Sequence, residues 1–429
     1  MPYISNPGFV GHSATEYVDP RVTSLISAVK NGQKTLVRKA LDDGADPNGK
    51  DADGVPVLHH AVWGGNKETM EMFLSEKIDP NAKDKDGRTP LSWAAERGSD
   101  TIVKLLIVFD GIDPNGADKA GKTPMAWAAQ CGYDKVVKSL LDCDGIDPNA
   151  TDNDDSTPLL WAACKGNNAV VKLLLTREDI KPNEKDKDGM TPLSWAAQRG
   201  YDKVVKSLLG WDGIDPNAAD NDGSTPLVWA ACRGNNAVVK LLLMREDIKP
   251  NEKDKDGITP LSWAAQRGYD KIVKSLLDWD GIDPNAKGND GSTPLLWAAC
   301  KDKVEAVRLL LAHDGIKPDL KDMNGRTPLS WAADRGYDAV IKLLTDHEGV
   351  DIQSTDEDGS TPLLWAACHG HEAAVSLLIG KGADLNIGDK NDMTPLDWAK
   401  YRGYEAVEQL LESAAEDLEQ PPTTVETKG

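Results

Sequence analysis

The sequence has no apolar run close to the ~20 residues that a membrane-spanning helix needs, which argues against an integral membrane protein. It is also poor in basic residues: 49 Lys and Arg stand against 70 Asp and Glu, a formal net charge of −21. Nucleic acids and anionic membranes are bound mainly through Lys and Arg, so this balance disfavours both as partners. Six cysteines in 429 residues make no disulfide framework, and the N-terminal stretch lacks the pattern of a secretory signal. Together these absences predict a cytoplasmic protein, with the nucleus as the alternative.

Phenylalanine is nearly absent, with 3 residues, whereas tryptophan is abundant, with 13. The tryptophans follow a repeat. Thr-Pro pairs begin every 34 residues from Thr89 to Thr361, and another begins 33 residues later at Thr394. Two divergent copies precede Thr89, which makes 12 units. Ten tryptophans lie four residues after the Thr of a pair: Trp93, Trp127, Trp161, Trp195, Trp229, Trp263, Trp297, Trp331, Trp365 and Trp398.

Each unit has the pattern of two short helices joined by turns. In one unit, the sequence DKDG at 186–189 is turn chemistry, and Thr191-Pro192 can then open a helix. Gly200 can end that helix, and apolar residues in 204–209 return at helical spacing for a second one. Helices of about nine residues are not stable alone. The units must therefore stack on their neighbours, as in a solenoid.

The recurring pattern D-x-x-G-x-T-P-L-x-x-A-A, followed by G, V-V-K-x-L-L and D-P-N, resembles the ankyrin repeat. The motifs T-P-L-S-W-A-A and D-G-I-D-P-N are similar to those in the long ankyrin arrays of fungal proteins. The resemblance implies an all-α fold, an ankyrin-repeat solenoid of about 12 helix-turn-helix units with short hairpin fingers over residues 21–412. Residues 1–20 are expected to be a flexible N-terminal segment, and 413–429 an acidic disordered tail.

Two short motifs resemble sites for nucleotides and for calcium, but their positions in the repeat explain both as turns. The stretch GADKAGKT at 116–123 fits the phosphate-binding loop of nucleotide-hydrolysing proteins. It occupies the register of the turns at 186–191 and 254–259, and it lacks the strand that such a loop follows. The run at 184–189 echoes the start of a calcium-binding EF-hand loop, but its twelfth position is Trp195 rather than Glu. We therefore expect neither nucleotide nor calcium binding.

Catalytic and metal-binding constellations are not recognisable in the sequence. Four cysteines share one register 68 residues apart, at Cys164, Cys232, Cys300 and Cys368. Neighbours two repeats apart would be ~20 Å from each other, too far for a disulfide or a shared metal. We expect no catalytic residue, no cofactor and no metal.

The tryptophans allow two interpretations. The column four residues after each Thr is expected either to pack between helices or to form a ladder on which a ligand stacks. Trp63 lies three residues further on in its unit. In ankyrin-like folds that position faces the concave groove, so Trp63 is predicted to be an exposed contact.

A row of basic residues is predicted along the same groove. The resemblance implies that the position just before the helix-ending glycine faces a partner, and eight of ten such positions are Arg or Lys, the others being Cys131 and His369. The eight are Arg97, Lys165, Arg199, Arg233, Arg267, Lys301, Arg335 and Arg402. One interpretation is structural, because a cation in the last turn favours the helix dipole and could pair with finger carboxylates. The other is a partner-binding row, and the two are compatible.

These observations predict a protein–protein interaction scaffold or adaptor that binds a partner protein through the groove and fingertips, without catalysis. Residues 123–190, 191–258 and 259–326 are near copies, so the groove presents nearly the same side chains again and again. That repetition favours an acidic or extended partner segment bound through many weak contacts. The alternatives are an accessory or regulatory component of an enzyme or biosynthetic system, or an enzyme that uses the groove as its active site.

Overall fold

The structure is a computed structural model that describes residues 18–73 and 77–419. Within these residues it contains 24 α-helices and no strand, only a single bridge between Lys50 and Pro56. The helices follow one another as antiparallel pairs, one pair for each repeat, so the predicted all-α solenoid of about 12 repeats is confirmed. The chain divides into two compact units, Met1–Lys187 and Asp188–Gly429.

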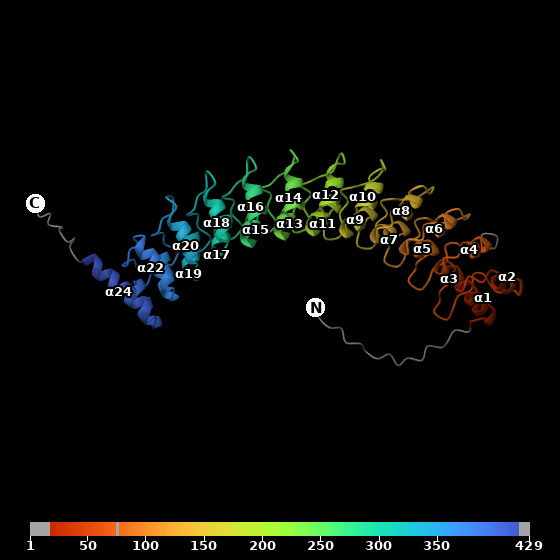
Figure 1. Cartoon of the computed structure of the whole chain (residues 1–429), viewed down its shortest axis with the longest axis horizontal. Helices are drawn as coiled ribbons and strands as arrows, with labels where there is room; N and C mark the ends of the chain where they lie inside the picture. The colour runs from red at the N-terminus through yellow and green to blue at the C-terminus, as the bar shows by residue number, and fades with distance from the viewer. Residues whose placement is uncertain (1–17, 74–76, 420–429) are drawn as a thin grey trace, which may run out of the picture. The chain divides into compact units, whose positions relative to one another are not determined.

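The first unit holds five helix pairs (Figure 1). In each pair the first helix contacts the first helix of the next pair, and the second helices form a parallel layer in the same way. The helices are α1 (Pro20–Lys30), α2 (Lys34–Asp42), α3 (Val57–Gly64), α4 (Lys67–Phe73), α5 (Pro90–Glu96), α6 (Asp100–Leu106), α7 (Pro124–Cys131), α8 (Asp134–Leu141), α9 (Pro158–Lys165) and α10 (Asn168–Leu174).

The second unit holds seven pairs stacked in the same manner. Its helices are α11 (Pro192–Arg199), α12 (Asp202–Leu209), α13 (Pro226–Arg233), α14 (Asn236–Leu243), α15 (Pro260–Arg267), α16 (Asp270–Leu277), α17 (Pro294–Cys300), α18 (Val304–Leu311), α19 (Pro328–Arg335), α20 (Asp338–Thr345), α21 (Pro362–Cys368), α22 (Glu372–Gly380), α23 (Pro395–Arg402) and α24 (Glu405–Glu419).

The ends of the first helices follow from the sequence. In α11, the hydroxyl of Thr191 accepts a hydrogen bond from the backbone N–H of Ser194 at 3.1 Å, and Pro192 occupies the first turn, where no N–H is needed. Gly200 ends the helix in the left-handed conformation, with φ 76°. Leu193 and the alanine pair after Trp195 are fully buried between neighbouring repeats. Short helices are thus stabilised by caps and by stacking rather than by their length.

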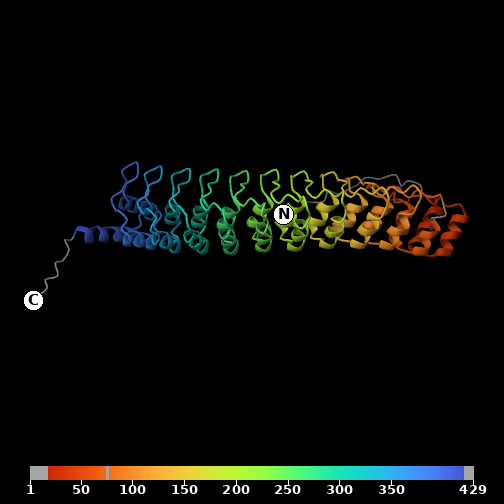
Figure 2. The same cartoon turned by 90° about the horizontal axis from the view of Figure 1, so that it is seen from above.

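The loops join successive repeats through hydrogen bonds. Figure 2 shows them gathered along one edge of the stacked helices in each unit. At the fingertips, the backbone N–H of Lys255 donates to the carbonyl of Asp222 at 2.8 Å, and that of Asn289 donates to Asp256 at 3.0 Å. Each finger is therefore held by the finger before it, which fixes the start of the next first helix.

The ends of the array differ in part from the sequence prediction. Helix α24 runs through residues 413–419, which the sequence assigned to the tail. The helix continues because Val407 and Leu411 are buried at helical spacing and the run SAA at 413–415 contains no helix breaker. Residues 1–17 and 420–429, to which the flexible segment and the rest of the tail were assigned, lie outside the described residues.

Candidate functional site

The eight predicted cations lie at the C-terminal ends of first helices, and all are exposed. We call them the basic row; its members are Arg97, Lys165, Arg199, Arg233, Arg267, Lys301, Arg335 and Arg402. Each precedes the left-handed residue that ends its helix, so the helix fixes the position of the side chain. Within a unit, the first helices contact one another in order, and the row follows them from repeat to repeat.

Most members of the row stack on the tryptophan four residues earlier in the same helix. The guanidinium carbons of Arg199, Arg233 and Arg267 each lie 5.6 Å from the ring centre of that tryptophan. Arg402 has the same geometry at 5.6 Å, and the Lys165 ammonium lies 5.8 Å from Trp161. Exposed cation–π contacts of this kind contribute ~0.5–1 kcal/mol and leave the charge accessible to a partner.

The structural interpretation of the row rested on the helix dipole and allowed ion pairs with finger carboxylates as well. In the described part of the chain, no such pair is formed by any member of the row. Arg335 alone forms an ion pair, with its helix neighbour Asp334, the Nε–Oδ2 distance being 3.5 Å. The favourable interaction of these cations with the helix dipole remains. Apart from Arg335, their positive charges are not paired with a carboxylate of the described residues.

Trp63 and Arg97 are brought together in the first unit. The guanidinium carbon of Arg97 lies 4.0 Å from the Trp63 ring centre, and Trp63 is 55% exposed. Together with Arg88, Trp93 and Glu96 they line a cavity of about 310 Å³. The predicted aromatic contact therefore lies beside the first member of the row.

The tryptophan column is neither buried core nor a free ladder. All ten side chains are half-buried, and the indole Nε1 of eight of them donates to the carboxylate of an aspartate nine residues earlier, over 2.7–3.0 Å. The acceptors are Asp84, Asp118, Asp152, Asp220, Asp254, Asp322, Asp356 and Asp389. Sequence reasoning treated these aspartates only as turn formers, although the constant spacing of nine residues was a usable signal.

Trp297 departs from this pattern. The residue nine positions earlier is Gly288, and the buried Nε1 of Trp297 has no hydrogen-bond acceptor among the described residues. Trp297 lines a cavity of about 510 Å³ with Cys300, Lys301 and Arg335. Burial raises the pKa of the Cys300 thiol to about 11, despite the opposing effect of the Lys301 and Arg335 charges. At neutral pH this cysteine is therefore a thiol rather than a nucleophilic thiolate.

A family model described as ankyrin repeats matches residues 10–84, 58–152, 145–220, 212–288, 280–356 and 338–420, almost the whole chain. The chain belongs to the ankyrin-repeat family. A crystal structure described as EF0377, an ankyrin repeat protein, is 27% identical and similar over 46% of this chain and 98% of its own, with a TM-score of 0.43. The comparison with curated proteins finds no match. Ankyrin repeats are generally protein-interaction modules, and the family is typically non-catalytic.

The phosphate-loop motif of this ankyrin-repeat chain forms an ordinary finger. The Nζ of Lys122 donates to the Gln130 side chain at 2.7 Å and lies 4.7 Å and 3.7 Å from the ring centres of Trp127 and Trp161. Burial lowers its pKa, although Asp152 and Asp118 favour the charged form. The residues before the motif, 107–109, lie in the turn after α6 rather than in a strand. Lys122 therefore packs between two repeats rather than facing a phosphate.

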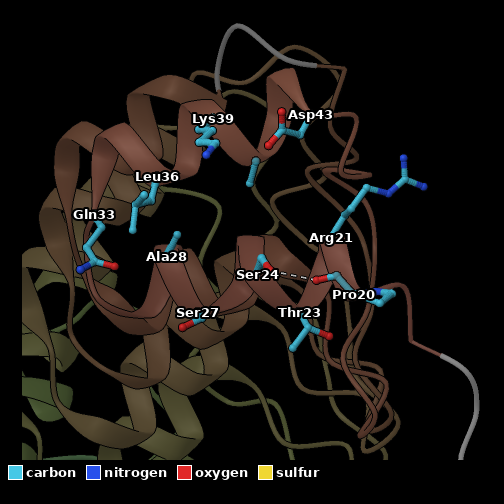
Figure 3. A pocket seen from close by; sticks show the side chains of 11 residues that line it. Pro20, Arg21, Thr23, Ser24, Ser27, Ala28, Gln33, Leu36, Lys39 and Asp43 are labelled. Carbon is cyan, nitrogen blue, oxygen red and sulfur yellow. Dashed lines mark hydrogen bonds between the residues drawn. The ribbon is translucent and has the colours of Figure 1, made fainter.

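A cavity of about 570 Å³ lies at the start of the first unit of the ankyrin-repeat chain. Figure 3 shows its lining side chains on α1, on α2 and at the two caps of α2, with Leu36 and Ala28 facing each other and the Arg21 side chain pointing away. The hydroxyl of Ser24 is used within the helix, where it donates to the carbonyl of Pro20 at 3.0 Å. No predicted site residue lines this cavity.

The described residues contain neither a metal-site cluster nor a helix suited to a membrane. Among residues 18–73 and 77–419, no cluster of His, Cys, Asp and Glu has the arrangement of a metal site. Over the same part of the ankyrin-repeat chain, no helix combines the length and apolarity needed to cross a bilayer.

Proposed function

We propose that the chain is a scaffold or adaptor that binds a partner protein through the basic row and the adjoining fingertips, without catalysis of its own. The observation that carries the proposal is that eight exposed cations lie at the ends of first helices in a chain of net charge −21. None of them forms an ion pair with a finger carboxylate among residues 18–73 and 77–419. An acidic, extended segment of the partner fits this surface best. Its side chains could contact several first helices in succession.

The near-identity of the repeats supports an extended partner. Helices α11, α13 and α15 contact one another in order and end in Arg199, Arg233 and Arg267, each exposed and each stacked on its own tryptophan at the same distance. A compact partner with an irregular surface would need different contacts at each repeat. Repeated weak contacts instead give affinity through multivalency. An accessory component of an enzyme system would use the same surface and differ only in its partner.

The experiment is a pull-down with the purified chain, followed by an affinity measurement with the recovered partner. Changing Arg199, Arg233 and Arg267 together to Glu should weaken binding about tenfold or more, because three exposed charge contacts are each worth ~0.2–1 kcal/mol and each reversal adds repulsion. The matched control changes Lys206, Lys240 and Lys274 to Glu. These lysines are also exposed, recur in the same three repeats and lie on the second helices.

The two triple variants carry the same change in charge, so a difference between them reports position rather than overall electrostatics. Equal weakening by both variants would reject the basic row as the binding surface. Turnover of a small molecule by the purified chain alone would reject the assignment as a scaffold.

A further inference from the structure

Among the described residues, Trp297 is the one tryptophan of the column whose buried indole has no acceptor, and it lines a cavity. Its volume is about 510 Å³, and it lies between α17 and α19, where Trp297, Lys301, Met323, Trp331 and Arg335 line it. Met323 is 68% exposed at its rim. The basic row thus passes the mouth of a cavity at this repeat.

The indole of Trp297 is a buried donor with no acceptor among the described residues. In the preceding repeat, the carboxylate of Asp254 accepts from the indole of Trp263 at 2.8 Å and from the backbone N–H of Ile258 at 2.8 Å. Gly288 replaces that aspartate before Trp297. Leaving a buried donor without an acceptor is unfavourable, so an acceptor that reaches the indole from the cavity would be bound favourably.

In this repeat Asp290 closes the finger, as Asp254 does in the preceding repeat, but it does not accept from the indole. Its Oδ1 accepts from the backbone N–H of Ser292 at 2.9 Å, and its Oδ2 accepts from the Ser292 hydroxyl at 2.8 Å. The turn is therefore closed, but both oxygens are engaged away from the indole. The nearby Asp322 is likewise engaged, by the backbone of its own finger and by Trp331 at 2.8 Å.

The cations around the cavity favour an anionic acceptor. Lys301 is exposed and forms no ion pair with any described residue, and no cation stacks on the Trp297 ring in the described part of the chain. Arg335 approaches from the next first helix, where its guanidinium is only loosely paired with Asp334 at 3.5 Å. The carboxylates of Asp290 and Asp322 oppose these charges but already accept hydrogen bonds within the fold.

We propose that this cavity binds the carboxylate of an aspartate or glutamate side chain from an acidic partner segment, with the Trp297 indole as hydrogen-bond donor and Lys301 and Arg335 as the flanking cations. The entering carboxylate takes the place that an aspartate of the chain itself holds in eight other repeats. The inference rests on the proposed function, since it assigns the chemistry of one contact on the same surface. Because the neighbouring repeats are similar, a distinct site beside Trp297 would fix which residue of the partner lies at which repeat.

The site can be closed by a single substitution. Gly288 is not among the glycines with positive φ, so a side chain is compatible with its backbone. A Cβ there would lie 3.0 Å from the Oδ1 of Asp290, so Asp290 would have to give up its bonds to Ser292, and the new aspartate would close the finger in its place. Gly288→Asp should restore the internal acceptor of the other repeats and exclude a carboxylate from outside.

The test is a titration of the full chain, labelled with ¹⁵N at its indoles and followed by NMR, with the N-acetylated, C-amidated peptide GSEESG. The Trp297 indole resonance, assigned by its loss in Trp297→Phe, should move on addition of the peptide at millimolar concentrations. The Trp263 resonance should stay in place, because its indole is already bonded to Asp254. In Gly288→Asp the movement should disappear, and in Lys301→Gln the affinity should fall about two- to fivefold.

The matched peptide GSQQSG carries amides in place of carboxylates and should have no effect. If it moves the Trp297 resonance equally, or if Gly288→Asp responds like the parent chain, the proposal is overturned. The other indole resonances report whether Gly288→Asp is folded. Should it not fold, an unchanged affinity in Lys301→Gln would overturn the proposal instead. Because the titration needs no natural partner, it decides this inference separately from the pull-down that tests the proposed function.

Discussion

Two neighbouring repeats of the second unit, the Asp254 repeat (254–268) and the Gly288 repeat (288–302), have the same helices but different turn chemistry. In the first, one aspartate closes the finger and also accepts from the tryptophan; in the second, the finger is closed by Asp290 and no described residue accepts from the tryptophan. The helix ends differ as well. Gly268 has φ 71°, whereas Asp302 adopts φ 53° in the place of the glycine.

The comparison shows that two tasks of one residue can be separated. Closing the finger is required by the fold, because the finger sets the start of the first helix, and Asp290 performs it from two positions later. Holding the indole is not required, since α17 forms without it. An acceptor for Trp297 can therefore come from a bound partner. The Gly288 repeat can in this way bind a group that the otherwise similar repeats cannot.

The largest effect is expected from converting the first repeat into the second with Asp254→Gly. The change removes three hydrogen bonds to one carboxylate, from the Trp263 indole at 2.8 Å and from the backbone N–H groups of Ile258 at 2.8 Å and Asp256 at 3.0 Å. Bonds to charged groups contribute ~1.5–3 kcal/mol each, but Asp256 can close the finger as Asp290 does and so restore part of the loss. The free energy of unfolding should therefore fall by about 3 kcal/mol in urea titrations. Asp254→Gly combined with Asp256→Ala should be less stable still.

The matched control is Asp256→Ala alone, at an exposed fingertip. It should change stability by no more than ~0.5 kcal/mol. If this substitution alone costs as much as Asp254→Gly, the separation of the two tasks is wrong.

Much of this fold was predictable from the sequence, and the reason is local. Thr191, Pro192 and Gly200 specify where a helix begins and ends by their own backbone chemistry, and ten units carry the same Thr-Pro pair. The candidate site was predictable in its exposed cations, because register alone places Arg199 or Arg233 at a helix end. The bond between Asp254 and Trp263 was not predicted, since it joins a finger to a helix through side chains whose directions depend on packing. The cavity beside Trp297 depends on that same bond being absent.

The second prediction concerns the alkylation rate of Cys300, which lines the cavity of the Gly288 repeat. Burial raises the pKa of its thiol from 9.0 to about 11, so that near pH 8 its thiolate fraction is about 100-fold below that of an unfolded cysteine. Alkylation by iodoacetamide, followed by mass spectrometry of the Cys300 peptide, should be slower by that factor. The rate should rise about tenfold per pH unit until about pH 11.

The direction of this pH dependence follows from the charges of the neutral thiol and the anionic thiolate of Cys300. A raised pKa means that the folded state holds the proton more tightly, so the thiolate forms only as the pH passes the folded value. A rate that levels off near pH 9 would contradict the burial of this thiol. Cys232, 68 residues earlier, offers the comparison with an intact aspartate, because Asp220 accepts from Trp229 there at 2.7 Å.

The smallest effect compares Trp263→Phe with Trp297→Phe. Both substitutions shorten a half-buried aromatic side chain at the same position of the repeat, so the loss of ring contacts should be similar. Trp263→Phe also removes the donor that Asp254 holds, whereas Trp297→Phe removes a buried donor with no acceptor. The first variant should therefore lose ~1–2 kcal/mol more of its free energy of unfolding than the second.

Urea titrations of both variants measure this difference, and a double-mutant cycle with Asp254→Ala assigns it. In that background the extra cost of Trp263→Phe should vanish, because the acceptor is already gone. An unchanged extra cost would place the difference in ring packing or in the Arg267 contact at 5.6 Å, rather than in the hydrogen bond. If Trp297→Phe is the more costly change, the Trp297 indole already has an acceptor in solution. The cavity would then be filled from within the chain, and the comparison between the two repeats would carry no argument for a ligand.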